Sequence, residues 1–208
     1  MSKLADRAGL VFFAVDAATL AQRLIGTRLV RLLDGERISG VIVETEAYLG
    51  VEDKAAHTYG GRRTARNEAM YGPPGTCYVY FTYGMHHCLN VVCGAVDEPV
   101  AVLIRALEPT EGLVTMRRLR TGAAKRSHPD TALCSGPGKI CQALAIDRKL
   151  NGTSLIGGAN LWLEERDPRP ITLGNSARIG VAYAESWSDR PLRWYLSGNP
   201  NISVVPRK

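Results

Sequence analysis

The chain has 208 residues, 45% of them hydrophobic and 22% charged, so we expect residues 1–208 to form a single ordinary domain with a substantial core. Its longest apolar runs have only the length of a strand, and its N-terminus shows no charged region followed by an apolar core, so we expect neither a membrane span nor a secretory signal. A formal net charge of +6 suits a polyanionic partner but does not identify one.

The first elements predicted along the chain are a helix and a β-hairpin. Asp16 is a typical helix N-cap and Gly26 can take the left-handed C-terminal position, so a helix is expected between them. Two β-rich runs, residues 27–33 and 37–48, follow. The pair Asp34 and Gly35 joins them and favours a tight turn with positive φ angles.

The remaining segments predict an α+β fold. Further strands are expected at residues 78–83, 88–93 and 100–107, helices at 64–71, 111–119 and 138–145, and short C-terminal strands at 193–196 and 202–205. Residues 151–160 form the loosest segment and predict a flexible loop. Strands and helices do not alternate as a doubly wound sheet requires, which favours an antiparallel sheet.

The cysteines predict reduced, mostly buried thiols rather than a disulfide framework or a metal site. They are odd in number and form no C-x-x-C pair. The alternative is a zinc site that joins two of them to His86 and His87, but zinc ligands usually come in spaced pairs. We therefore expect chemistry without a metal or another cofactor. The five cysteines are Cys77, Cys88, Cys93, Cys134 and Cys141.

The strand at residues 37–48 carries the sharpest chemical signal. The two-residue period of a strand puts Ile42, Glu44, Glu46 and Tyr48 on one face, so carboxylates and an aromatic ring project together. His57 follows soon enough in the chain to return to this face and hydrogen-bond one of its polar groups. The alternative is an ordinary solvated sheet face.

A second signal is a run of tyrosines. Tyr78 and Tyr80 share a strand face on which bases could stack, and Gly84 permits a turn directly afterwards. At that turn, Tyr83 and Met85 form the kind of wedge that enters a base step and replaces an extruded nucleotide. The alternative is ordinary packing of tyrosines on a sheet.

Arginine and lysine side chains mark further candidate contacts. Arg105 interrupts an apolar strand, so it needs an anionic partner; a structural salt bridge to Glu108 or Glu44 and a role in a site are equally open. The run at residues 135–139 precedes a predicted helix, and Lys139 with the helix N-terminus could receive a phosphate. Two basic patches flank these motifs; they contain Arg62, Arg63 and Arg66 in one and Arg117, Arg118, Arg120, Lys125 and Arg126 in the other.

Taken in order, these segments resemble the alkyladenine (3-methyladenine) DNA glycosylase family over roughly residues 24–205. The runs that carry the resemblance are VETEAY at 43–48, AAH at 55–57, GGR at 60–62, YVY at 78–80, YGM at 83–85, RALEPTEG at 105–112 and LCSGP at 133–137. The resemblance implies a compact α+β domain with a curved, mainly antiparallel sheet, surrounding helices and a protruding β-hairpin.

It also implies that the protein binds duplex DNA containing damaged purines through the minor groove, with Tyr83 intercalating and Met85 beside it, and flips a purine into a pocket. In the resemblance Tyr48, His57 and Tyr80 surround the base. Further matches are Asn90, which opposes the 2-amino group of guanine, Glu46, the catalytic base, and Arg105, which positions the water. Arg62, Arg66 and Lys139 are our candidates for contacts to the DNA backbone.

The activity implied is monofunctional hydrolysis of the N-glycosidic bond of 3-methyladenine, 7-methylguanine, hypoxanthine or ethenoadenine, without a cofactor, leaving an abasic site. We expect a monomer of bacterial type, cytoplasmic and associated with the nucleoid. His86 and His87 depart from the aromatics of some relatives. The rival interpretation is a non-catalytic nucleic-acid-binding module in which Glu46 is incidental; a small-molecule transferase is weaker, because no nucleotide-cofactor motif is present.

Overall fold

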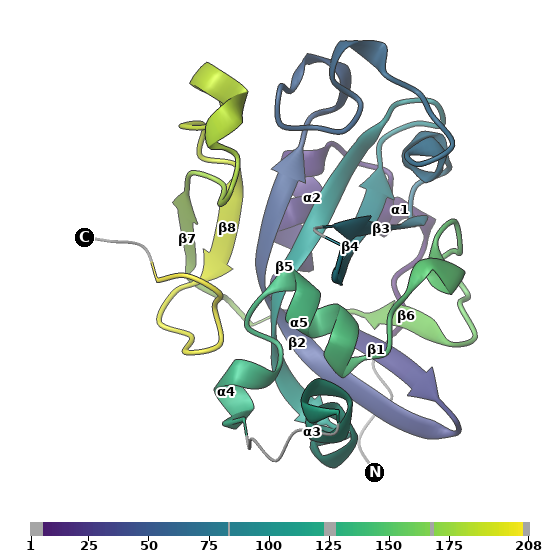
Figure 1. Ribbon diagram of the computed structural model, residues 1–208, viewed down its shortest axis with the longest axis vertical. Coiled ribbons are helices and arrows are strands. Elements are labelled where there is room, and N and C mark those ends of the chain that lie inside the picture. Colours follow the sequence, from purple (N-terminus) through teal and green to yellow (C-terminus); the bar gives the residue numbers. More distant parts are fainter. Residues whose placement is uncertain (1–5, 83, 123–127, 167–168, 206–208) are drawn as a thin grey trace.

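The computed structural model describes residues 6–82, 84–122, 128–166 and 169–205. Within them, eight strands form one sheet whose pairings are all antiparallel (Figure 1). Its main path runs β3-β4-β5-β2-β1-β6, and β8 pairs with both β2 and β7. The strands are β1 Arg28–Leu33, β2 Glu36–Tyr48, β3 Cys77–Thr82, β4 His86–Cys93, β5 Val100–Glu111, β6 Leu161–Glu164, β7 Leu173–Ser176 and β8 Arg193–Leu196.

Helices surround the curved sheet, which confirms the α+β prediction. Helix α2 packs against β2 and β5, whereas α5 packs against β4 and β5. The α-helices are α1 Leu10–Phe13, α2 Ala17–Leu24, α3 Leu113–Thr121, α4 Asp130–Leu133 and α5 Pro137–Ala143. Short 3₁₀ helices span Gly50–Glu52, Tyr59–Gly61, Glu68–Tyr71, Arg148–Leu150 and Ala182–Trp187.

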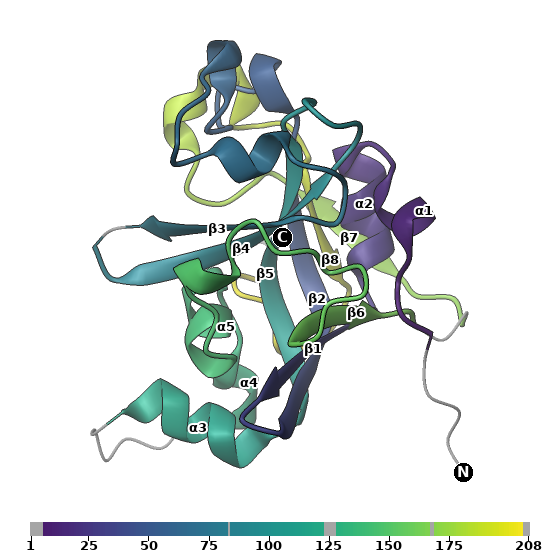
Figure 2. The same cartoon turned by 90° about the vertical axis from the view of Figure 1, so that its right-hand side faces the viewer.

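Local sequence signals place the first helix and hairpin correctly. The Asp16 carboxylate accepts a hydrogen bond from the Thr19 N–H at 2.9 Å and caps α2. Asp34 and Gly35 have φ angles of 50° and 82°, the positive values that a tight hairpin turn requires. The hairpin β3–β4 also forms as expected and projects from the body of the domain (Figure 2).

Two predicted segments differ from expectation because side chains take over backbone hydrogen bonds. Residues 64–71 contain only the 3₁₀ turn Glu68–Tyr71, since the Asn67 side chain accepts from the Thr64 N–H and so competes with a longer helix. Residues 202–205 form no strand; the Ser203 N–H donates to the Glu44 carboxylate instead. Residues 151–160 form a loop, as predicted, and backbone hydrogen bonds attach this loop to Cys77 at the start of β3.

The sheet separates an apolar core from a polar, aromatic face. The main core cluster joins α2 and α5 to one side of the sheet through residues such as Leu20, Ile104 and Ile140. A second, smaller cluster includes Tyr78 and Ala101 and lies toward the residues predicted to bind a base. Successive side chains of β5 therefore point alternately into the core and toward the candidate site.

Two irregularities in the pairing of β2 with β5 set which side chains face that site. Ile42 pairs with Leu107 and Glu44 with Ala106, so Val43 is an extra residue. The bulge puts Ile42 in the main core, and the expectation that it shares a face with Glu44 is wrong. A second shift leaves Arg105 unpaired in the ladder. The bulge aims its side chain at the two carboxylates of β2.

Candidate active site

The four residues predicted to surround a base lie together in one pocket. They are Tyr48 at the end of β2, His57 in the following loop, Tyr80 on β3 and Asn90 on β4. The full lining consists of Tyr48, Ala55, His57, Met70, Tyr78, Tyr80, Asn90, Ala101 and Tyr183. Strand pairing explains the assembly, because β3, β4, β5 and β2 are consecutive neighbours in the sheet. We call this the aromatic pocket.

His57 and two tyrosines form one side of the aromatic pocket. The Tyr78 and Tyr80 rings stack with centroids 5.3 Å apart, and the His57 ring meets Tyr80 edge-on at 4.6 Å. His57 Nδ1 lies 2.8 Å from the Tyr78 hydroxyl, so its partner belongs to β3 and not, as we expected, to the polar face of β2. Burial, together with Arg66 and Arg62, lowers the pKa of His57, which favours a neutral imidazole at neutral pH.

Asn90 is fixed by the strand beside it. Its side-chain amide donates to the Tyr78 carbonyl at 3.1 Å, and only 4% of the residue is exposed. The pairing of Tyr78 with Asn90 across β3 and β4 supplies this geometry. Because its side chain is held in this way, Asn90 forms a rigid part of the pocket wall.

Glu46 lies immediately behind the Tyr48 hydroxyl and is fully buried. Its carboxylate accepts from the Ile179 N–H at 2.7 Å and from the Tyr48 hydroxyl at 3.0 Å, and it lies 3.2 Å from the Arg105 guanidinium. Burial raises the pKa of Glu46, and Arg105 and the Ile179 N–H offset only part of that effect. A raised pKa makes the ionised carboxylate a stronger base.

Glu44 also contacts Arg105, but its surroundings hold it as an anion. It accepts from Arg105 Nε at 2.9 Å, Arg193 Nε at 2.7 Å and the Ser203 hydroxyl at 2.8 Å. Burial acts to raise the pKa of Glu44, but Arg105, the Ser203 N–H and Arg193 outweigh it, so the pKa is lowered. Arg105 thus occupies both positions considered for it, a salt bridge to Glu44 and a contact with Glu46. Glu108 instead accepts from Asn199.

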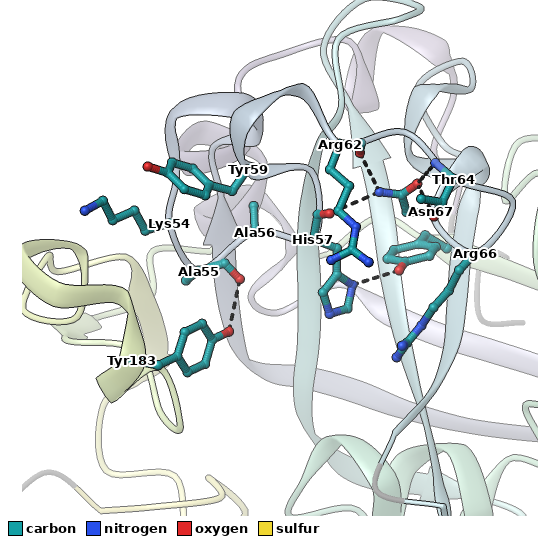
Figure 3. A pocket seen from close by; sticks show the side chains of 11 residues that line it. Lys54, Ala55, Ala56, His57, Tyr59, Arg62, Thr64, Arg66, Asn67 and Tyr183 are labelled. Carbon is teal, nitrogen blue, oxygen red and sulfur yellow. Dashed lines mark hydrogen bonds between the residues drawn. The ribbon is translucent and has the colours of Figure 1, made fainter.

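A second, more open pocket adjoins the aromatic pocket. The two share Ala55, His57, Tyr78 and Tyr183, and the open pocket adds a basic rim (Figure 3). In Figure 3, Arg62 and Arg66 lie beside His57, across the opening from Tyr183. The rim consists of Lys54, Arg62 and Arg66. Arg63, by contrast, turns away and pairs with Glu68 and Asp97.

The remaining predicted contacts lie on or beside the β3–β4 hairpin. Met85 is 69% exposed at its tip, whereas Tyr83 lies outside the described residues. Lys139 is on α5, and its amine donates to the Ser135 hydroxyl at 3.0 Å. The neighbouring Gly138 lies against His86, which pairs with Thr82 next to the turn of the hairpin. The hairpin tip and the basic side chains are thus well separated in sequence but border the same end of the sheet.

Sequence patterns missed several residues that hold this site together. Arg178 makes a fully buried, two-pronged ion pair with Asp53, at 2.5 and 2.8 Å. Arg193 and Ser203 neutralise and hydrogen-bond Glu44, and Tyr183 lines both pockets. All but Asp53 come from the C-terminal part of the chain, where turns and short strands show no periodicity. Only their distance in space, not their spacing in sequence, connects them with Glu44 and Glu46.

The described residues also bear on the sulfur chemistry and on membranes. All five cysteines are buried and none is paired with another, which agrees with the prediction of buried free thiols. Across the described ranges, no three or more His, Cys, Asp or Glu side chains are grouped so as to hold a metal ion. The helices within those ranges are too short or too polar to cross a bilayer.

Comparison with known proteins links this arrangement to one family. The model of the methylpurine-DNA glycosylase family matches residues 11–200. DNA-3-methyladenine glycosylase of Mus musculus is 49% identical over 97% of this chain, which spans only 62% of the mouse protein. The Homo sapiens protein of that name is 48% identical over 97% of this chain and 69% of its own length. A Desulfitobacterium hafniense relative, provisionally named 3-methyladenine DNA glycosylase, is 44% identical over 95% of this chain and 98% of its own.

Proposed function

Because this chain belongs to the methylpurine-DNA glycosylase family, we propose that it is a monofunctional DNA glycosylase that excises damaged purines in base-excision repair. The purine class comprises 3-methyladenine, 7-methylguanine, hypoxanthine and ethenoadenine. The protein acts as a monomer on duplex DNA in the cytoplasm, where it associates with the nucleoid. The product is an abasic site in an uncut strand.

The observation that carries this proposal is the buried carboxylate of Glu46 directly behind an aromatic pocket. A flipped purine stacks between Tyr48 and the rings of Tyr80 and His57. Its sugar then faces Glu46, with Arg105 beside the carboxylate at 3.2 Å. Because the pocket is lined by rings and closed by β-strands, the reacting groups are largely withdrawn from bulk water.

The reaction needs one water and one base. Glu46 accepts a proton as the water oxygen bonds to C1′ of the deoxyribose, while the C1′–N bond breaks and its electron pair leaves with the purine. The negative carboxylate also stabilises the positive charge that develops on the sugar. Arg105 positions the water and favours the ionised form of Glu46. An alkylated purine that is already cationic leaves as a neutral base, whereas hypoxanthine needs hydrogen bonding or protonation as it leaves.

The surface around the aromatic pocket supplies the DNA contacts. Tyr83 and Met85 enter the base stack from the minor groove and fill the space of the flipped nucleotide. The guanidinium groups of Arg62 and Arg66 and the amine of Lys139 bind backbone phosphates. Two observations support this division: Met85 is exposed on a projecting hairpin, and Arg62 and Arg66 line the opening next to the aromatic pocket.

The test is single-turnover excision of hypoxanthine and ethenoadenine from defined duplexes. The strand should break only after alkali, because the enzyme itself leaves an abasic site. Glu46→Gln should lower the excision rate constant by about 10²–10⁴-fold, the usual contribution of a general base. Glu52→Gln is the matched control, since this carboxylate is exposed. It should excise at the wild-type rate.

Three outcomes would count against the proposal or a part of it. Duplex binding by the wild type without release of these bases or of alkylated purines would favour the non-catalytic nucleic-acid-binding module. Strand cleavage without alkali would contradict the monofunctional reaction. Retention of full excision in Glu46→Gln would transfer the role of the base to another group.

A further inference from the structure

A guanidinium lies against the ring that forms one wall of the aromatic pocket. The Arg178 guanidinium carbon is 4.8 Å from the centroid of the Tyr48 ring, within the range of a cation–π contact. The same guanidinium pairs with Asp53 and donates to the Ala47 carbonyl at 3.0 Å. Its position is therefore fixed by several partners at once.

Arg178 is on the side of Tyr48 that faces away from the pocket. The Tyr48 ring lines the pocket and Arg178 does not, and the Arg178 side chain is 0% exposed. The ring thus separates a permanent cation from whatever occupies the pocket. Arg178 directly precedes Ile179, whose N–H binds Glu46, so this cation and the reaction centre share one backbone segment.

The other rings of the pocket also have cationic neighbours. The Arg66 guanidinium lies 6.0 Å from the Tyr80 ring, at the limit of a cation–π contact. Arg66 is exposed, so water screens its effect, unlike that of Arg178. Burial together with Arg66 and Arg62 lowers the pKa of His57, which favours the neutral form of that ring.

These contacts affect neutral and cationic bases differently. The face of an aromatic ring attracts a cation because the ring quadrupole is negative there. A guanidinium on the rear face draws that electron density toward itself and repels a second positive charge across the ring. A neutral purine stacks without this opposition, whereas a purine alkylated at N3 or N7 brings a full positive charge into the pocket.

We propose that Arg178 is a specificity-determining residue that, acting through the Tyr48 ring, biases the aromatic pocket toward neutral damaged purines and against cationic ones. This inference rests on the proposed glycosylase function. Arg178 does not touch the base; it sets the electrostatic character of the surface on which the base stacks. Asp53 moderates the bias, because its carboxylate neutralises part of the Arg178 charge.

The sign of the effect distinguishes this role from a purely structural one. Loss of the buried ion pair would disturb Tyr48 and lower excision of every base together, whichever partner is removed. The electrostatic role instead predicts opposite shifts for the two partners. Removing the cation favours cationic bases, whereas removing only the Asp53 carboxylate leaves Arg178 less compensated and disfavours them.

The experiment compares single-turnover rate constants for duplexes with one 7-methylguanine, which is cationic, or one hypoxanthine, which is neutral. Arg178→Met should raise the ratio of 7-methylguanine to hypoxanthine excision about tenfold, which lies between the effects of exposed and desolvated cation–π contacts. Asp53→Asn should lower the ratio, and Arg178→Lys, which keeps the charge, should stay near wild type. Arg66→Met is the exposed counterpart and should change the ratio much less.

A second pair of variants tests the route through the ring. In a Tyr48→Leu background, Arg178→Met should leave the ratio within about twofold, because the ring that transmits the effect is absent. If Arg178→Met does not fold, Asp53→Asn/Arg178→Gln removes both charges but keeps hydrogen-bonding groups, and it too should raise the ratio. Thermal unfolding of each variant reports whether it is folded.

An unchanged ratio in every folded variant, or a shift of the same sign in Arg178→Met and Asp53→Asn, would overturn the proposal and leave Arg178 a structural residue. Wild-type excision of both bases upholds the glycosylase function in either case. Failure of the wild type to release either base would refute that function, and this inference with it.

Discussion

Glu44 and Glu46 stand two positions apart on β2, both 0% exposed, yet their pKa values shift in opposite directions. Glu44 is held by Arg105, Arg193 and two groups of Ser203. Glu46 shares Arg105 and otherwise receives one backbone N–H and the Tyr48 hydroxyl. Burial alone therefore does not decide the state of a carboxylate. The number of cations beside it does.

In the proposed reaction, this difference separates a structural anion, Glu44, from a reactive one, Glu46. The guanidinium groups of Arg105 and Arg193 both pair with Glu44, so its negative charge is compensated within the protein. Glu46 shares a single guanidinium and hydrogen-bonds the hydroxyl of Tyr48, which lines the aromatic pocket, so in the proposed reaction part of its charge remains for the sugar. Period-two geometry places both carboxylates on one face, but only the long-range partners distinguish them.

The largest effect is expected at Arg105, because its guanidinium contacts both Glu44 and Glu46. Arg105→Met should lower the free energy of unfolding by about 3–5 kcal/mol, because it leaves Glu44 and Glu46 with an uncompensated buried charge. It should also reduce excision by at least about 10²-fold, since Glu46 loses its neighbouring cation. Urea unfolding and single-turnover excision measure the two effects.

Arg193→Met is the matched control, because Arg193 is equally buried but pairs with Glu44 and not with Glu46. Its stability should fall by a similar amount while excision falls much less. Equal losses of excision in both variants would mean that the two carboxylates act as one unit and would end the distinction between them.

A smaller effect is expected from the two carboxylates themselves. At pH 7.5, Glu44→Gln should lower the free energy of unfolding by about 3 kcal/mol, because Arg193 loses its ionic partner. Glu46→Gln should leave stability unchanged or raise it, because it removes a buried charge that burial disfavours. Urea titrations of both variants beside the wild type give the difference.

The pH dependence sharpens this test because the signs are opposite. The pKa of Glu44 is lowered below 4.5, so its stabilising contribution is present above that pH and is lost as the pH falls through its folded value. The pKa of Glu46 is raised above 4.5, so its contribution is present at low pH and is lost as the pH rises. Both variants should therefore have the free energy of unfolding of the wild type in acid. As the pH rises, Glu44→Gln should become less stable than the wild type and Glu46→Gln more stable. Parallel curves would contradict the assignment.

The smallest effect concerns the basic rim. Arg62→Ala should weaken duplex binding severalfold and reduce the slope of log affinity against log salt by about 1, as expected for the loss of one phosphate contact. Arg118→Ala, an exposed arginine on α3, serves as the control and should leave the slope unchanged. Fluorescence anisotropy at several salt concentrations measures both. An unchanged slope in Arg62→Ala would remove Arg62 from the DNA contacts.

Local chemistry explains what the sequence could predict. The turn at Asp34 and Gly35, the cap at Asp16 and the shared face of Tyr78 and Tyr80 each depend on neighbouring residues, and each is confirmed. The same period-two rule failed for Ile42, because a bulge in the pairing with β5 is set by the partner strand. Patterns within one segment do not reveal such a shift.

The part of the candidate site that the sequence did not predict depends on contacts between residues that are far apart in the chain. Arg178 meets Asp53 across 125 residues of chain, and Arg193 meets Glu44 across 149. His57 was placed near the right pocket, but its hydrogen bond goes to Tyr78 on another strand. Burial, not spacing, selects these partners, since a charge removed from water must find an opposite one wherever the chain supplies it.

The last described turn of the chain has a consequence for handling the protein. Ser203 binds Glu44 through its N–H and its hydroxyl, and Arg193 donates to the Val204 carbonyl. C-terminal residues usually tolerate trimming and fusion tags well. Here, by contrast, Ser203 and Val204 hydrogen-bond the buried ion pair of Glu44 and Arg193. A purification tag is better placed at the opposite end of the polypeptide, and a clone shortened before Ser203 would let solvent reach Glu44.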